Sequence, residues 1–183
     1  MTARKDRREA AIERMADYVL KEGLAAATLR PLATAAGTSD RMLLYYFADK
    51  DELLAAVLDR IADRLLGELE AAIPIGPPRS FAILLHEVWA VLGSPRHRPY
   101  MNIWLDLAAG AARDLQPHRN VASAIADGYL AWVNDRLAHA VDSGPSQSAP
   151  LFLAAIEGMF LLNAIGRPAV ASKAMAELSG RCV

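Results

Sequence analysis

Apolar residues recur at intervals of three and four along the whole chain, and this spacing most restricts its fold. Side chains three and four positions apart lie on one face of an α-helix, whereas a strand places apolar residues at every second position. Strand-like alternation is absent, and the strong helix formers alanine and leucine dominate. The sequence therefore predicts an all-α protein.

The composition is typical of a chain that folds without covalent support. Its 183 residues are 54% hydrophobic and 22% charged, which excludes a disordered, highly charged chain. The only cysteine, Cys182, cannot form an internal disulfide, which fits a reducing compartment. Charges interrupt the first apolar segment, so we expect no secretory signal, and the longest charge-free run, 143–156, is too short to span a membrane. A cytoplasmic protein with no membrane partner is expected.

Glycine, proline and capping residues divide the chain into predicted helices. The proline-rich segment 74–79 is the clearest break and separates two unlike parts. The expected helices cover residues 6–22, 28–36, 40–46, 49–72, 80–92, 99–112, 117–141, 151–165 and 169–179.

Residues 28–54, TLRPLATAAGTSDRMLLYYFADKDELL, contain a predicted helix-turn-helix. The small side chain of Ala33 lets two helices cross closely, and Gly37, four positions later, supplies the positive φ of a tight turn. Ser39 is placed to cap the next helix, whose N-terminal end faces the DNA major groove in such motifs.

These elements resemble, in order and spacing, the TetR family of bacterial transcriptional regulators over about residues 10–61. The resemblance implies an N-terminal three-helix DNA-binding domain over 1–47, a connecting helix over 48–73 and a helical ligand-binding and dimerisation domain over 74–183. The shared elements are Gly23 at the end of a helix, Thr28 at the start of the next, the Ala36-Gly37 turn, the closing Tyr45-Tyr46-Phe47 and Lys50.

The resemblance also implies DNA-contacting roles. Lys50 matches a lysine that holds a phosphate, Arg41 occupies a recognition position, and two tyrosines touch the backbone or pack the motif. Leu44 stands where the family most often has a phosphate-contacting tyrosine, so that contact is either lost or transferred to Tyr45. The candidate DNA-binding residues are Thr28, Ser39, Asp40, Arg41, Tyr45, Tyr46 and Lys50.

Positive charge collects ahead of the motif, although the whole chain has a net charge of −1. Four basic residues, Arg4, Lys5, Arg7 and Arg8, stand against the single acid Asp6 within residues 1–8. This segment is either an arm along the DNA backbone or a solvated helix end.

The C-terminal part combines large apolar side chains with few polar ones, a composition that suits either a ligand pocket or a plain core. Few of these residues are charged, so an effector held there would be largely apolar and uncharged or weakly polar. The candidate effector-binding residues are His86, Trp89, Met101, Trp104, Tyr129, Trp132, Met159, Phe160 and Asn163.

The last two expected helices match the family's dimerisation helices. The resemblance therefore implies a homodimeric repressor that a small-molecule effector releases from a palindromic DNA operator. The alternative is a DNA-binding regulator whose C-terminal part only dimerises or binds a protein, without an effector pocket. The candidate interface residues are Ala154, Gly158, Leu162, Ala171, Met175 and Leu178.

Signals for catalysis are weak. His86-Glu87 begins like a zinc-protease helix, but Ala90 stands where the second histidine is required. The sequence has neither a nucleophile elbow nor a phosphate-binding glycine loop. We therefore expect neither an enzyme nor a metal or cofactor site.

Overall fold

The computed structural model describes residues 2–137 and 148–180, with side chains described from Lys5 onward. Cys182, the predicted helix end at 138–141 and most of the predicted 143–150 loop lie outside the described residues.

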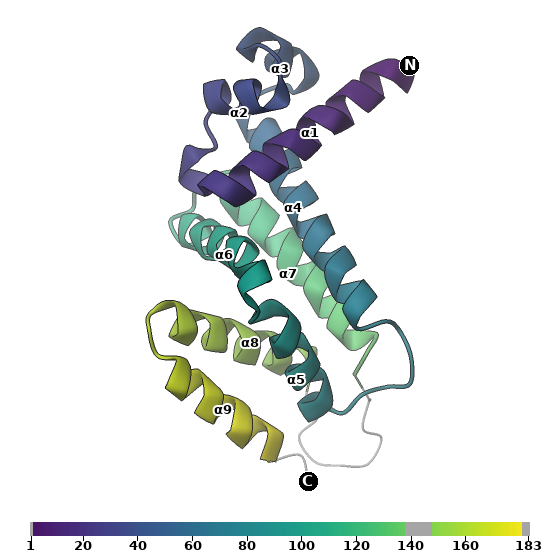
Figure 1. The fold of residues 1–183 in the computed structure, drawn as a ribbon, viewed down its shortest axis with the longest axis vertical. Helices are drawn as coiled ribbons and strands as arrows, with labels where there is room; N and C mark the ends of the chain where they lie inside the picture. The colour runs from purple at the N-terminus through teal and green to yellow at the C-terminus, as the bar shows by residue number, and fades with distance from the viewer. Residues whose placement is uncertain (1, 138–147, 181–183) are drawn as a thin grey trace. The chain divides into compact units, whose positions relative to one another are not determined.

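Every regular element of the described part is helical, which confirms the predicted all-α class (Figure 1). No described helix is long and apolar enough to cross a membrane. The α-helices are α1 (Thr2–Glu22), α2 (Leu29–Ala36), α3 (Asp40–Tyr46), α4 (Lys50–Ala72), α5 (Phe81–Leu92), α6 (Arg98–Ala111), α7 (His118–Asn134), α8 (Ala149–Ala164) and α9 (Pro168–Gly180), with short 3₁₀ turns η1 (Leu24–Ala26) and η2 (Pro95–His97).

The described helices form two compact units. Unit 1 contains the residues up to Leu65 together with Pro99–Ile125, and unit 2 contains Leu66–Arg98 and the residues from Ala126 onward. This division cuts α4 after Leu65 and α7 after Ile125, whereas the sequence suggested boundaries after 47 and 73. Residues far along the chain thus belong to the same unit as the helix-turn-helix.

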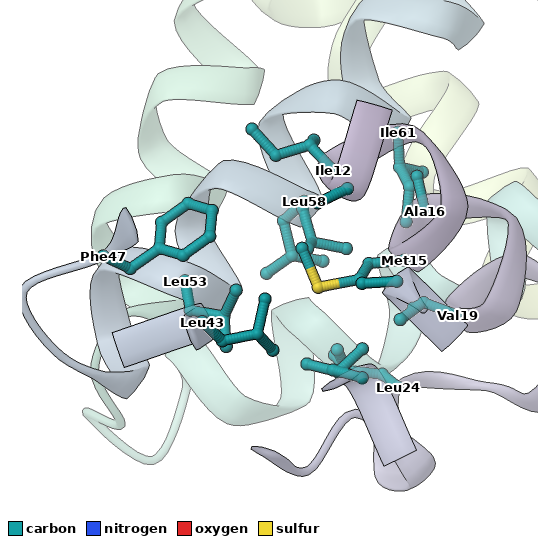
Figure 2. Close-up of a cluster of buried hydrophobic side chains, with 14 of the residues drawn as sticks. Ile12, Met15, Ala16, Val19, Leu24, Leu43, Phe47, Leu53, Leu58 and Ile61 are labelled. Atoms are coloured by element: carbon teal, nitrogen blue, oxygen red, sulfur yellow. The ribbon is translucent and has the colours of Figure 1, made fainter. Parts of the chain in front are cut away.

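Unit 1 is built around one hydrophobic core, which Figure 2 shows with side chains from α1, α3 and α4 converging. Met15 and Val19 of α1 and Leu43 of α3 are fully buried there. Helix α6 adds Ile103 and Leu107 to the same core. The helix-turn-helix and α6 are therefore stabilised by shared packing, which the sequence did not indicate.

Ion pairs join α1 to α4 along one side of unit 1. Arg60 pairs with Glu9 at 2.5 Å, Arg64 pairs with Asp17 at 2.7 Å, and Glu13 pairs with both arginines. The hydrogen bond from Arg64 is the largest cause of a lowered pKa of the Glu13 carboxyl. Because these residues follow one another at intervals of four, the pairs form a ladder that holds the two helices together.

Unit 2 packs α5, α8 and α9 against one another. Phe81 of α5 meets Phe152 of α8 edge-on at 5.4 Å between ring centroids. Trp89 of α5 meets Phe160 of α8 at 5.1 Å. The predicted long apolar α8 is thus a core helix of this unit, consistent with its buried Phe152 and Ile156.

Helix α7 ends at Asn134, which is earlier than predicted. Arg136 follows in a turn, and its side chain is only 2% exposed. Its Nε donates to the Ile73 carbonyl at 2.8 Å, and its Nη1 donates to the Trp132 carbonyl at 3.1 Å. The Arg136 carbonyl in turn accepts from the Arg79 backbone N–H at 2.8 Å. These tertiary bonds end the helix, and none of them is visible in the local sequence.

His97 is the other buried polar residue of the described part. Its Nε2 lies 2.8 Å from Glu68 Oε2, and its Nδ1 lies 2.9 Å from the hydroxyl of Ser94. The imidazole therefore ties the last turns of α4 to the connection between α5 and α6.

Candidate nucleic-acid interface

The turn between α2 and α3 has the geometry that the sequence predicted. Gly37 ends α2 with a φ of 70° in the left-handed region. The Gly37 N–H donates to the Thr34 carbonyl at 3.0 Å, and the Thr38 N–H donates to the Ala33 carbonyl at 2.9 Å. These bonds satisfy carbonyls at the end of α2 and fix the direction in which the chain enters α3.

Arg14 of α1 supports the same turn and was not singled out from the sequence. Its Nη1 donates to the Ala36 carbonyl at 3.2 Å. A Cβ atom added at Gly37 would lie 3.1 Å from this nitrogen, which is tighter than nine in ten real Cβ contacts. A side chain at position 37 would thus be strained and would also crowd the arginine.

Helix α3 is oriented by a cap at one end and by buried residues on one side. The Ser39 hydroxyl accepts from the Met42 N–H at 3.3 Å, which confirms the predicted cap. Leu43 is fully buried and Phe47 is 1% exposed, so this side of α3 faces the core of unit 1. Arg41 and Tyr45 are exposed as a result.

Helix α4 starts with a double cap that leaves Lys50 at its exposed first position. Asp49 Oδ1 accepts from the Glu52 N–H at 2.8 Å, the first of the two hydrogen bonds of a capping box. The Glu52 carboxylate accepts from the Ala48 N–H at 2.5 Å. The Lys50 ammonium is therefore presented at the N-terminal end of a long, well-anchored helix.

The predicted DNA-binding residues all lie in unit 1, and only Tyr46 is not exposed. Tyr46 packs against the core of unit 1 and lies edge-on to Tyr45 at 5.8 Å. Thr28 precedes α2 in an extended conformation, but its side chain makes no capping hydrogen bond. The exposed members are Thr28, Ser39, Asp40, Arg41, Tyr45 and Lys50.

The basic N-terminal segment is helical, because α1 begins at Thr2. Lys5 and Arg7 are exposed, and the side chain of Arg4 lies outside the described side chains. Arg8 lies 4.5 Å from the centroid of the Phe47 ring and 3.6 Å from Glu52. Arg8 therefore stabilises the junction between α3 and α4 within the fold.

The predicted effector-binding residues divide between the two units. Met101 and Trp104 belong to unit 1, where Trp104 packs against the hydrophobic core. The other seven belong to unit 2, where His86 and Asn163 are exposed and Met159 and Phe160 are buried.

Two aromatic residues at the end of α7 form a buried polar pair in unit 2. The rings of Tyr129 and Trp132 stack at 5.8 Å with an angle of 12°. Burial, assisted by the charge of Glu157, raises the pKa of the Tyr129 hydroxyl, which therefore stays protonated. The Tyr129 hydroxyl and the Trp132 Nε1 are both buried without a hydrogen-bond partner in the described structure.

The predicted interface residues on α8 and α9 have unequal exposure. Ala154 and Gly158 are exposed, and a Cβ atom at Gly158 would meet nothing within 4 Å. Leu162 and Leu178 are half-buried. Ala171 and Met175 are 1% and 5% exposed, so they belong to the chain's own core and are removed from the candidate surface. Three exposed apolar residues that the prediction omitted lie nearby in sequence: Leu161, Ile165 and Val170.

The helix-turn-helix lies in a segment that matches a known protein family. Residues 18–57 match the family model of bacterial regulatory proteins, tetR family. This segment runs from the later part of α1 through α2 and α3 into α4. No curated protein sequence matches the chain.

Several solved structures have the same fold. A TetR-family transcriptional regulator from Rhodococcus sp. is 21% identical with a TM-score of 0.71, over 97% of this chain and 96% of that one. A TetR-family regulator from Cytophaga hutchinsonii is 17% identical with a TM-score of 0.74, over 98% and 94%. The multidrug binding protein EbrR complexed with proflavin is 22% identical with a TM-score of 0.66, over 97% and 99%.

The family match covers the part of the chain that forms the helix-turn-helix, and the whole described fold is that of these regulators. This segment of the chain is therefore similar to the tetR family of bacterial regulatory proteins.

Proposed function

We propose that the chain is a TetR-family transcriptional regulator, a homodimeric repressor that binds a palindromic operator through α3 and leaves it when a small effector binds in unit 2. The observation that carries the proposal is the helix-turn-helix, in which buried Leu43 and Phe47 hold α3 with Arg41 and Tyr45 exposed. A single short recognition helix contacts few base pairs, so specific binding requires two copies on two half-sites.

Within this proposal, Lys50 and Tyr45 position the protein on phosphates, together with Thr28 and Ser39. Arg41 reads bases. Lys50→Ala should then weaken binding to all duplexes about equally and reduce the slope of log K against log salt by about one. Arg41→Ala should cost about 1 to 3 kcal/mol at particular base pairs.

Titrations of cognate and random duplexes at several salt concentrations measure both effects. Arg96→Ala is the control, because it removes a cation of η2 in unit 2 that is 76% exposed and lies outside α8 and α9, and it should change neither quantity. An Arg41→Ala variant that loses the same factor on cognate and random DNA would contradict a base-reading role.

The proposed dimer interface consists of the exposed surface of α8 and α9. Ala154 and Gly158 lie four positions apart on α8 and allow two backbones to approach closely. Leu161, Ile165 and Val170 supply exposed apolar area beside the connection between the two helices. Small and apolar residues exposed on two consecutive helices support association with a second copy.

The proposed effector site lies within unit 2, at Trp89, Phe160, Tyr129 and Trp132. The rings offer apolar area, and the two unpartnered buried donors, the Tyr129 hydroxyl and the Trp132 N–H, call for a hydrogen-bond acceptor. An uncharged aromatic compound that carries a carbonyl meets both needs. The EbrR complex with the aromatic compound proflavin, on a similar fold, supports an aromatic ligand.

Titration of tryptophan fluorescence with a panel of uncharged aromatic ketones tests this site. At least one ketone should bind and weaken operator affinity, typically by 5 to 150-fold, and operator should weaken ketone binding by the same factor. Trp132→Phe should reduce ketone affinity, because it removes one donor and keeps an aromatic ring. Equal ketone affinity with and without operator would contradict effector-driven release.

A further inference from the structure

Helix α3 has few side chains that can form hydrogen bonds with base edges. Its seven residues, DRMLLYY, include Arg41 and Asp40 but no asparagine, glutamine, lysine, serine or threonine. The side chains that ordinarily pair with adenine or guanine in the major groove are therefore reduced to one arginine. To distinguish one base pair from another, α3 therefore needs contacts other than hydrogen bonds to base edges.

The exposed surface of α3 is largely apolar instead. Ten large hydrophobic residues are exposed in the described part of the chain, and three of them lie in this short helix. Met42 is 39% exposed, Leu44 45% and Tyr45 58%. An isolated exposed leucine is ordinary, but this concentration on the helix that enters the groove is not.

The apolar group that the major groove offers is the C5-methyl of thymine. Contact with it removes apolar surface of both partners from water, whereas a leucine placed against a phosphate leaves the phosphate without a hydrogen bond. An exposed leucine on a recognition helix therefore favours a base pair that contains thymine.

The position of Leu44 relative to Arg41 fixes where that thymine lies. The two residues are three positions apart on a helix whose other side is held by buried Leu43, so they are neighbours on the exposed side. Their β-carbons are about 5 to 6 Å apart, as is usual at this spacing. Successive base pairs are separated by about 3.4 Å, so the two side chains reach base pairs one or two steps apart.

We propose that Leu44 reads the operator through the C5-methyl of a thymine, one or two base pairs from the pair that Arg41 contacts. The inference rests on the proposed operator binding through α3. It assigns a specificity-determining role to a residue that was not among the candidate DNA-binding residues.

The test begins with a duplex that the wild-type protein selects from a random-sequence pool. Each thymine of a half-site is then replaced by deoxyuridine, which removes the methyl group and keeps the base pairing. At one thymine the replacement should weaken wild-type binding about fourfold, the factor expected for one methyl-sized apolar group. Replacement in both half-sites should weaken it about fifteenfold, the product of two such factors.

The variant Leu44→Ala separates the contact from other effects of uracil. In this variant the ratio of thymine to uracil affinity at that position should fall to about one. Met42→Ala shortens another exposed apolar side chain of the same helix and should keep the fourfold ratio. Circular dichroism of both variants should match wild type, because both side chains are exposed.

Three outcomes overturn the inference while leaving operator binding intact. In the first, replacing thymine by deoxyuridine weakens binding at no position. In the second, the loss of affinity on that replacement persists in Leu44→Ala. In the third, Met42→Ala abolishes that loss and Leu44→Ala does not. Failure of the wild-type protein to select any sequence would instead contradict the proposed function itself.

Discussion

Replacing Gly158 with glutamate should convert the proposed dimer into monomers that no longer hold a palindromic operator. A Cβ atom at this position meets nothing within 4 Å in the single chain, so the folded protomer accommodates the larger side chain. In a dimer formed by α8 and α9, however, the two glutamates would be buried without partners. An uncompensated buried charge costs about 3 to 5 kcal/mol, so the dimer dissociation constant should rise at least about a hundredfold.

Analytical ultracentrifugation over a range of protomer concentrations measures this change, and operator titration follows its consequence. Gly128→Glu is the matched control, because Gly128 is an exposed glycine of α7 at which an added Cβ atom would likewise meet nothing within 4 Å. The control should remain dimeric and bind operator. A Gly158→Glu protein that stays dimeric at the wild-type concentration would exclude this surface as the interface.

The helix-turn-helix was predictable because its determinants are local. The end of α2 depends on Gly37, which adopts a positive φ that other residues rarely adopt. The start of α3 depends on Ser39 and that of α4 on Asp49, and each cap acts within three residues of its own position. Such short-range chemistry is present in the sequence before any tertiary contact forms.

The supports of the motif depend on distant residues, and the sequence did not reveal them. Arg14 reaches a carbonyl twenty-two positions away, and Ile103 joins the same core as Leu43. A basic residue on a predicted amphipathic helix has the same pattern whether it is solvated or donates to a neighbouring turn. Nothing in the local spacing shows which of the two applies.

Composition alone does not locate an effector site, because large apolar side chains are common both in cores and in ligand sites. Trp104 and Trp89 look alike in sequence, yet Trp104 packs in unit 1 and Trp89 lies in unit 2. Ala171 and Met175 have the spacing of an interface stripe but face the core of their own chain. The spacing of apolar residues identifies the apolar side of a helix. It does not show which other element packs against that side.

Arg136→Leu should lower the free energy of unfolding by about 2 to 4 kcal/mol, because it leaves two buried carbonyls without a donor. The guanidinium donates to Ile73 and Trp132 and lies 4.1 Å from the centroid of the Trp132 ring. For a chain of this size, the loss corresponds to a fall in Tm of about 5 to 15 °C. Denaturant and thermal unfolding at a fixed protomer concentration measure it.

Replacement of a buried charge by an apolar side chain can be neutral or even stabilising when the partner charge is removed as well. That compensation does not apply at Arg136, because its acceptors are backbone carbonyls that remain after the substitution. Burial lowers the pKa of Arg136, and the nearby charge of Glu70 acts against that shift.

Two further variants distinguish this account from a general effect of losing an arginine. Arg136→Lys keeps the charge but has no planar fork to serve two carbonyls, so its loss of stability should be smaller than that of Arg136→Leu. Arg119→Leu removes an arginine that is 64% exposed and paired only at the surface, so it should change stability by less than about 1 kcal/mol. Wild-type stability of Arg136→Leu would mean that the two carbonyls find other donors, and the early end of α7 would then need a different cause.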